Sequence, residues 1–462
     1  MIGKIIERSV AHPVAVLFGA LLLALAGVYG LLNTPRDAIP DLADVQVIVY
    51  TDYPEQSPQT VEAQVTYPLT TALRGVPRAK VVRGYSSFGL SFVYVIFADG
   101  TDPYWARSRV AEYLSQARAR LPAGITPQIG TDASSVGWVY QYALVDKSGR
   151  NDLSQLRSLQ DWFLRYELQS VPGVAEVASI GGFVKQYQVE VDPLRLVAQG
   201  VSLPQLREAI RRSNRDVGGR VLEISEMEYM VRGLGLIRSV ADIENIALGV
   251  NPRGTPVRVK DVAHVTIGPE LRRGLAELNG EGETVGGIVV MRRGENAPGV
   301  IAAVKQRLEE LKPGLPAGVE VVPVYDRSDL IARALRTLSV TLIEEIVVVA
   351  LVCLLFLMHA RSALVAAVTL PLGILFSFSI MRAQGLEASI MSLGGLAIAI
   401  GAMVDAALVM IENAHKHLER GGAPENRRAV IVAAAKQVGP ALFFCLLIIT
   451  VSFLPILALE AQ

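Results

Sequence analysis

The sequence predicts an α-helical membrane bundle joined to a large α+β region outside it. Hydrophobic residues make up 51% of the 462 residues, and the mean hydropathy is +0.38. Apolar runs long enough to cross a bilayer lie at the start of the chain and in its last third. The segment between them, 33–335, alternates instead between strand and helix patterns. Together these observations indicate a membrane protein with a substantial folded part outside the bilayer.

Five apolar runs predict five membrane-spanning helices. The first follows a short amphipathic segment, residues 1–12, and no A-x-A-like cleavage site comes after it, so we interpret it as an uncleaved span. An odd number of spans ending at Gln462 predicts the first half of a longer membrane protein. The runs occupy 13–32, 336–358, 363–382, 390–411 and 436–459.

Positive charge predicts the orientation of the spans. Lys4 and Arg8 precede the first span, Arg361 lies in a short turn, and further basic residues occupy the loop predicted at 413–428. These positions fall on one side if the spans alternate, and that side is the cytoplasm. The region 33–335 is therefore expected on the outer side.

The outer region reads as two similar units. Residues 33–134 follow the order β-α-β-β-α-β, which is the split βαβ or ferredoxin-like arrangement. A second unit begins at 135–191, with its last strand predicted at 186–191, and is completed at 271–335. Residues 192–270 form an inserted α/β module between the two parts.

An acid lies inside the fourth predicted span. A carboxylate at the depth of Asp405 costs about 2.5–3.5 kcal/mol, so an acid there indicates function by default. Glu412 follows seven positions later on the same helical face, near the membrane end, where it reaches water. We interpret Asp405, and more weakly Glu412, as proton-binding residues.

Two methionines share the opposite face of the same helix. Met403 and Met410 are also seven positions apart. A thioether is a neutral, soft ligand that selects Cu(I) or Ag(I) over Zn²⁺ or Mg²⁺. Methionines at helical spacing also serve simply as packing, and the pattern leaves that alternative open. An acid and a sulfur stripe on one helix predict a proton-driven metal pump.

Several other functions are not supported. The net charge is zero, so no nucleic-acid partner is expected. The chain has no GxxxxGK[ST] motif for ATP and no HExxH or Ser-His-Asp pattern, which favours a secondary active transporter over an enzyme. No bound cofactor is expected. The two cysteines, Cys353 and Cys445, lie in predicted spans and are interpreted as small buried hydrophobes.

Two stretches carry a resemblance to a known family. P-R-D-A-I-P-D-L follows the first span, and GAMVDAALVMIENAHK lies in the fourth. With these, essentially the whole chain resembles the N-terminal half of a resistance-nodulation-division (RND) transporter. It is most similar to the copper/silver subgroup of the heavy-metal efflux branch.

The resemblance implies a homotrimer in the inner membrane of Gram-negative bacteria. The two split βαβ units would be periplasmic porter subdomains, and the insertion would be a docking subdomain. The implied partners are a periplasmic membrane-fusion adaptor and an outer-membrane channel. Asp405 would be the intramembrane proton-relay acid, and Met391, Met403 and Met410 would pass Cu(I) or Ag(I) through the membrane.

One departure and three alternatives qualify this interpretation. Leu271 stands where the copper subgroup is expected to carry a methionine of the outer pathway. A divalent-cation (Zn/Co/Cd) RND exporter is therefore one alternative. A multidrug RND pump needs an aromatic-rich pocket, but aromatic residues make up only 6% of the chain. A non-transporting membrane scaffold would need neither the acid nor the methionines.

Overall fold

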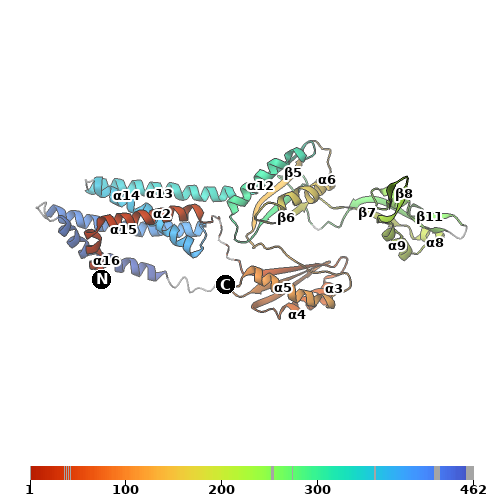
Figure 1. The fold of residues 1–462 in the computed structure, drawn as a ribbon, viewed down its shortest axis with the longest axis horizontal. Helices are drawn as coiled ribbons and strands as arrows, with labels where there is room; N and C mark the ends of the chain where they lie inside the picture. Colours follow the sequence, from red (N-terminus) through yellow and green to blue (C-terminus); the bar gives the residue numbers. More distant parts are fainter. Residues whose placement is uncertain are drawn as a thin grey trace.

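The computed structural model shows a bundle of long helices at one end and sheet-containing units at the other, with the inserted module farthest from the bundle (Figure 1). It describes residues 2–35, 37, 39, 41, 43–250, 254–272, 274–357, 360–420 and 427–453.

The first unit is a four-stranded antiparallel sheet with helices packed on it. Its strand order is β2-β3-β1-β4. Buried and partly exposed residues alternate along β1, so one face of the strand meets the helices. Val49, Leu69 and Val110 are fully buried between the sheet and the helices. The elements are β1 (Gln46–Asp52), α3 (Pro58–Val61), α4 (Tyr67–Leu73), β2 (Ala79–Ser87), β3 (Leu90–Phe97), α5 (Pro103–Ala117) and β4 (Gln128–Ile129).

The second unit repeats this arrangement with strands drawn from two distant parts of the chain. Its strand order is β14-β5-β13-β6, and each neighbouring pair is antiparallel. If the strands of each unit are numbered 1 to 4 along the chain, the first sheet has the order 2-3-1-4 and the second has 4-1-3-2. The two orders are the same when one sheet is read from its opposite edge. The elements are β5 (Trp138–Asp146), α6 (Leu153–Leu159), α7 (Arg165–Gln169), β6 (Val174–Gly181), β13 (Val285–Met291), α12 (Ala297–Leu311) and β14 (Val319–Asp326).

The first helical segment of each unit contains a π-helical turn. In the first unit, Glu62–Thr66 forms a π turn between α3 and α4. Gln160–Leu164 does the same between α6 and α7. Each turn carries a buried polar side chain that bonds to its sheet. Thr66 is 2.7 Å from the Ser91 hydroxyl, and Gln160 accepts from Tyr142 at 2.8 Å.

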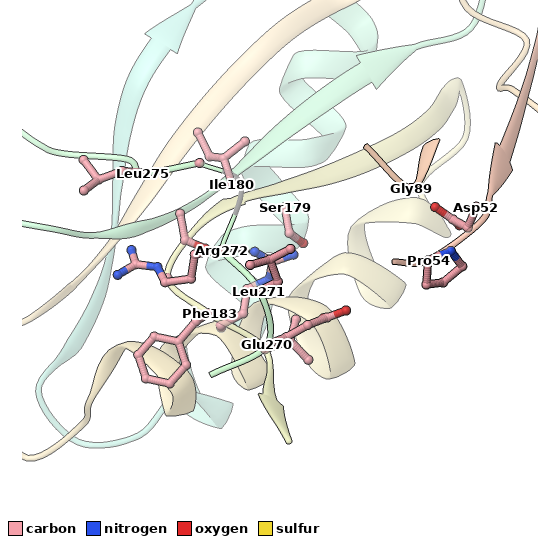
Figure 2. A pocket seen from close by; sticks show the side chains of 15 residues that line it. Asp52, Pro54, Gly89, Ser179, Ile180, Phe183, Glu270, Leu271, Arg272 and Leu275 are labelled. Carbon is pink, nitrogen blue, oxygen red and sulfur yellow. Dashed lines mark hydrogen bonds between the residues drawn. The ribbon is translucent and has the colours of Figure 1, made fainter. Parts of the chain in front are cut away.

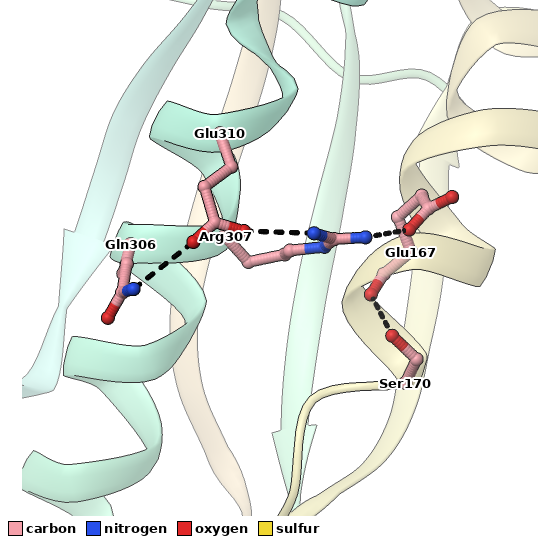
Figure 3. Close-up of polar contacts among 5 residues, drawn as sticks. All are labelled: Glu167, Ser170, Gln306, Arg307 and Glu310. Carbon is pink, nitrogen blue, oxygen red and sulfur yellow. Dashed lines mark hydrogen bonds and ion pairs between the residues drawn. The ribbon is translucent and has the colours of Figure 1, made fainter.

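A charged network joins the two helical segments of the second unit (Figure 3). Arg307 on α12 donates to Glu310 on the same helix at 2.9 Å and to Glu167 on α7. Gln306 also donates to Glu310. Hydrogen bonds from Arg307 lower the pKa of the Glu310 carboxyl. Because these groups are partly exposed, their ion pairs add little to the folding stability of the unit. Their main effect is to fix α12 relative to α7.

The prediction that strand 186–191 belongs to the second unit is wrong in its pairing. The strand forms as β7 (Lys185–Val191), but it pairs along its whole length with β12 (Ala263–Pro269). The two strands make a separate ribbon that leads to the inserted module (Figure 1). Strand propensity is local, whereas the partner of a strand is set by distant sequence.

The inserted module has its own small core, which includes Leu206, Val259 and Val262. Every residue of β8 and β9 is exposed on the hairpin that they form. The elements between β7 and β12 are α8 (Pro193–Gln199), α9 (Leu203–Ser213), β8 (Val217–Ile224), β9 (Met227–Gly233), α10 (Val240–Glu244), β10 (Ala247–Val250), β11 (Pro256–Arg258) and α11 (Val259–Val262).

Long helices form the bundle. Close contact between α2 and α14 is possible because α2 has glycines there: a Cβ on Gly27 would lie 2.4 Å from Leu375, and one on Gly30 would lie 2.8 Å from the carbonyl of Phe378. The helices are α1 (Ile2–Ala11), α2 (Pro13–Asn33), α13 (Arg327–Leu357), α14 (Ala360–Gln384), α15 (Ile390–Arg420) and α16 (Arg427–Ser452).

Within the described residues, three helices are long and apolar enough to cross a membrane. They are Pro13–Asn33, Ile390–Glu419 and Arg427–Ser452, and Val368–Gln384 is a shorter apolar helix. The spans predicted at 336–358 and 363–382 lie within α13 and α14, although residue 358 is outside the described part. The end of the last predicted span, 454–459, is also outside it.

One predicted boundary is corrected. Residues 413–420 were assigned to a cytoplasmic loop, but α15 continues as a helix to Arg420. Glu412–Lys416 and His415–Glu419 pairs, each four positions apart, support this extension. Helix α13 begins at Arg327, directly after β14, so the span predicted from 336 starts inside this helix.

Candidate functional site

Helix α15 carries all five predicted site residues. Its first turn is fixed by two serines: the Ser389 hydroxyl accepts from the Ser392 N–H at 3.3 Å, and the Ser392 hydroxyl accepts from the Ser389 N–H at 2.8 Å. This reciprocal pair satisfies free N–H groups at the helix start. From there the helix runs unbroken past Asp405 to Arg420. The site residues are therefore held on one rigid element.

The end of the Met403 side chain packs against Gly373 of the neighbouring helix α14. Only glycine leaves room for it, because a Cβ at position 373 would lie 2.4 Å from Sδ of Met403 and 2.3 Å from its Cε. Met403 is half-buried and packs against the apolar cluster that contains Leu370 and Leu393. The thioether of Met403 thus faces α14.

Met410 and Met391 lie elsewhere along α15. Met410 is half-buried near Gly439 of α16, where an added Cβ would lie 3.9 Å from its Cε. Met391 is 70% exposed at the start of the helix. With a rise of 1.5 Å per residue, the three methionines are spaced by about 18 Å and about 10 Å. The structure therefore does not gather them into one site but places them at successive heights.

The two acids have different surroundings. Asp405 is exposed on α15. Glu412 is exposed too and forms an ion pair with Lys416, with Oε1 and Nζ 2.6 Å apart. Such a pair on a helix surface is an ordinary i,i+4 contact. Within the part of the chain that the structure describes, no group of three or more His, Cys, Asp or Glu residues is placed to hold a metal ion.

A cavity of about 740 Å³ lies between the first and second units (Figure 2). Asp52 and Pro54 of the first unit line one wall, and Phe183 and Leu271 of the second line the other. Leu271 is 66% exposed there. The residue that departs from the copper-subgroup pattern therefore lies in this cavity, where it presents an isobutyl group and no sulfur.

Sequence reasoning missed a junction between the bundle and the second unit. Arg327, the first residue of α13, is only 2% exposed. Its Nε lies 2.8 Å from Oδ1 of Asp37, just after the first span, and it also donates to the carbonyl of Val136 in the linker between the units. The sequence offered one signal for this junction. Arg327 stands directly before one long apolar helix, and Asp37 stands directly after another.

The loop between α14 and α15 completes this junction. The Asp37 N–H donates to the Ala388 carbonyl at 3.2 Å, and the Ala388 N–H donates to the Pro35 carbonyl at 2.9 Å. Nearby, Arg293 of the second unit pairs with Asp41 at 3.3 Å and donates to the Ala43 carbonyl. The segment after the first span is therefore tied to the outer unit and to the start of α15.

Comparison with known proteins identifies the family. A sequence profile described as the AcrB/AcrD/AcrF family matches residues 5–461. The chain belongs to this family. This confirms the predicted resemblance to the RND transporters.

Individual relatives place the chain near the cation efflux systems. It is 59% identical to the cation efflux system protein CusA of Escherichia coli strain K12 over 470 residues, and 58% identical to the putative cation efflux system protein SilA of Salmonella typhimurium. The cobalt-zinc-cadmium resistance protein CzcA of Cupriavidus metallidurans is 37% identical. The first two comparisons cover 100% of this chain and 45% of the relative, and the third covers 99% and 44%.

A solved structure shows the same fold. The crystal structure titled as a heavy metal efflux pump, crystal form II, matches with a TM-score of 0.84 and 34% identity. The match covers 100% of this chain and 45% of that one. The chain therefore spans less than half the length of the relatives it matches.

Replacing Gly373 by alanine is expected to displace the Met403 thioether. The new methyl group would overlap Sδ and Cε, but a methionine end is flexible, so the cost should be small, about 1 kcal/mol. In NMR spectra of ¹³C-methyl methionine, the Met403 signal should shift and the Met410 signal should not. Gly401→Ala is the matched control, because no described atom lies within 4 Å of a Cβ at that position. Equal shifts in both variants would contradict the packing of Met403 against Gly373.

Proposed function

We propose that this chain forms part of a proton-driven exporter of heavy-metal cations, with Cu(I) or Ag(I) as the transported ion. The observation that carries the proposal is identity of 58–59% to cation efflux proteins along the whole chain. The lower identity to a cobalt-zinc-cadmium resistance protein, 37%, favours a monovalent over a divalent cation. The methionines of α15 also favour a soft monovalent ion, because thioether sulfur is a soft ligand.

The architecture supports a separate role in such an exporter for each part of the chain. The two units of equivalent strand order suit ferredoxin-like porter subdomains, at 33–134 and at 135–191 with 271–335. The inserted module at 192–270 suits a docking subdomain, because the β7–β12 ribbon carries it away from the second sheet. We assign the bundle to a bacterial inner membrane and the outer units to the periplasm. The working assembly would be a homotrimer with a periplasmic adaptor and an outer-membrane channel.

The chemistry on α15 divides between two kinds of group. Asp405 takes up and releases a proton, because a carboxyl group is the only titratable function at that depth of the helix among its described residues. Met391, Met403 and Met410 offer weak, soft ligands at successive heights, and a weak ligand releases its ion as a conduit requires. Glu412, paired with Lys416, has the weaker claim to a proton role.

Replacing Asp405 by asparagine tests the proton role. In a full-length transporter that contains these residues, Asp405→Asn is expected to abolish metal-dependent proton movement, because an amide cannot carry a proton. One charge moved through the membrane supplies about 2.3 kcal/mol per 100 mV, and that source would be lost. The measurement is the internal pH of proteoliposomes after addition of Ag(I). Glu412→Gln is the matched control and should retain most activity; wild-type proton movement in Asp405→Asn would remove Asp405 from the mechanism.

Replacing Met403 and Met410 together by leucine tests the metal role. Leucine nearly conserves volume, so stability should change by less than about 1.5 kcal/mol. Silver tolerance of cells that depend on the transporter should nevertheless fall. Tolerance equal to wild type, at equal protein level, would show that both methionines serve only as packing.

A further inference from the structure

Helix α15 ends in polar residues at the end of the bundle farthest from the outer units. The loop before the helix bonds to the segment after the first span, through Ala388 and Pro35. The helix then runs for 31 residues, which is about 45 Å, to Arg420. His417 lies in this last stretch and is partly exposed. In the proposed orientation of the bundle, this end meets the cytoplasm.

His417 continues the face of α15 that carries Met403 and Met410. The three residues are spaced by seven positions, and each such step turns the face by only about 20°. Along the axis, His417 lies about 10 Å beyond Met410, which is the same step as from Met403 to Met410. The paired side chains of Glu412 and Lys416 leave the helix in other directions, more than about 90° from this face.

The imidazole of His417 is held with one ring nitrogen free. Its Nδ1 lies 3.0 Å from the carbonyl oxygen of Asn413. Because a carbonyl only accepts, Nδ1 carries the proton in this contact, and the neutral ring keeps its lone pair on Nε2. Among the described residues, Nε2 has no hydrogen-bond or ion-pair partner. A metal-binding histidine commonly donates its other N–H in this way, which fixes the ring and its tautomer.

Asn413 is itself fixed to the neighbouring helix α16. Its Nδ2 donates to the Ala434 carbonyl at 2.9 Å and to Oε1 of Gln437 at 3.4 Å. The carbonyl that orients His417 therefore belongs to a residue that joins two helices.

His415 provides an internal comparison. It lies two positions earlier, so its side chain leaves the helix about 160° away from that of His417. Its Nε2 lies 3.1 Å from Oε1 of Glu419, so the nitrogen that is free in His417 is occupied in His415. The two histidines differ in both direction and partner, and only His417 has the arrangement of a ligand.

Three helices meet at the height of Met410. A Cβ on Gly439 of α16 would lie 2.8 Å from Cδ1 of Ile6 and 3.9 Å from Cε of Met410. An ion pair between Glu7 and Lys436 fixes α1 against α16 at the same place. An ion that approaches from this end of the bundle therefore meets the partly exposed histidine before it reaches Met410.

We propose that His417 is a metal-binding residue that receives Cu(I) or Ag(I) through Nε2 and passes the ion to Met410. The inference rests on the proposed export of a soft cation. Imidazole binds several transition metals, including copper and zinc, whereas a thioether selects Cu(I) and Ag(I). His417 therefore receives the ion and Met410 selects it. A Zn²⁺ ion would bind to His417 and would not be passed on.

Protection of His417 from diethyl pyrocarbonate tests the metal site. The reagent modifies an unprotonated imidazole nitrogen, and cleavage by trypsin after Lys416 places His415 and His417 on separate peptides for mass spectrometry. In the full-length transporter, silver nitrate in chloride-free buffer should slow modification of His417 several-fold and leave His415 unchanged. Zn²⁺ should protect His417 as well. Absence of protection by Ag(I), or equal protection of His415, would overturn the site.

Transport kinetics test the passage of the ion to Met410. In the full-length transporter, His417→Ala should raise the KM for Ag(I) several-fold and leave kcat near wild type, because at saturating metal Met410 is filled directly. His417→Met should restore a low KM, since it places a thioether on the same face. His415→Ala is the matched control and should keep the wild-type KM. A wild-type KM in His417→Ala would overturn the receiving role of His417.

These outcomes are separable from the proposed function, because protection of His417 does not require transport. A transporter that exports Ag(I) while His417 stays unprotected would overturn only the role of His417. A transporter that moves no Ag(I), although His417 is protected, would overturn the proposed export and leave His417 as a metal ligand.

Discussion

The buried ion pair between Arg327 and Asp37 lies at the junction that joins the helical bundle to the outer units. A guanidinium that is 2% exposed loses nearly all of its hydration, a cost of several kcal/mol, which Asp37 and the Val136 carbonyl offset. Because Arg327 directly follows β14 and begins α13, the second sheet and a helix of the bundle share one continuous backbone at this point. Asp37 adds the end of the first span, and Ala388 adds the start of α15.

This arrangement gives a physical route between the two ends of the molecule. Helix α15 is unbroken from Ile390 past Met403 and Asp405, so a displacement of the loop before it is carried to those residues by a rigid element. Asp405 lies about 22 Å along the helix from Ile390. The proposed proton site at Asp405 is thus connected to this junction by one helix. The Met403 thioether, seated against Gly373, would move relative to α14 in the same displacement.

Local features of the structure were predictable from the sequence, and their partners were not. The apolar run around Asp405 and the alternating pattern of β1 identify their elements because periodicity is a local property. The apolar run 390–411 marked only part of α15: the helix continues to Arg420 through residues assigned to a loop, and the i,i+4 pair of Glu412 and Lys416 lies on this continuation. The pairing of β7 with β12 depends on residues more than seventy positions away, which periodicity does not encode. Arg327 escaped notice because it is unremarkable until the fold brings it to Asp37. The roles of Asp405 and the methionines stay predictions.

A double-mutant cycle on Asp37 and Arg327 tests the central claim most directly. Stability of the junction would be measured by hydrogen exchange of the 32–46 and 380–392 peptides in wild type, Asp37→Asn, Arg327→Met and the double variant. Removing one partner of a buried pair costs about 3–5 kcal/mol because the other charge is left uncompensated. The account predicts that the double variant loses clearly less protection than the sum of the single variants. Additive losses would show that the two side chains act independently and that the bundle is fixed to the outer units by other contacts.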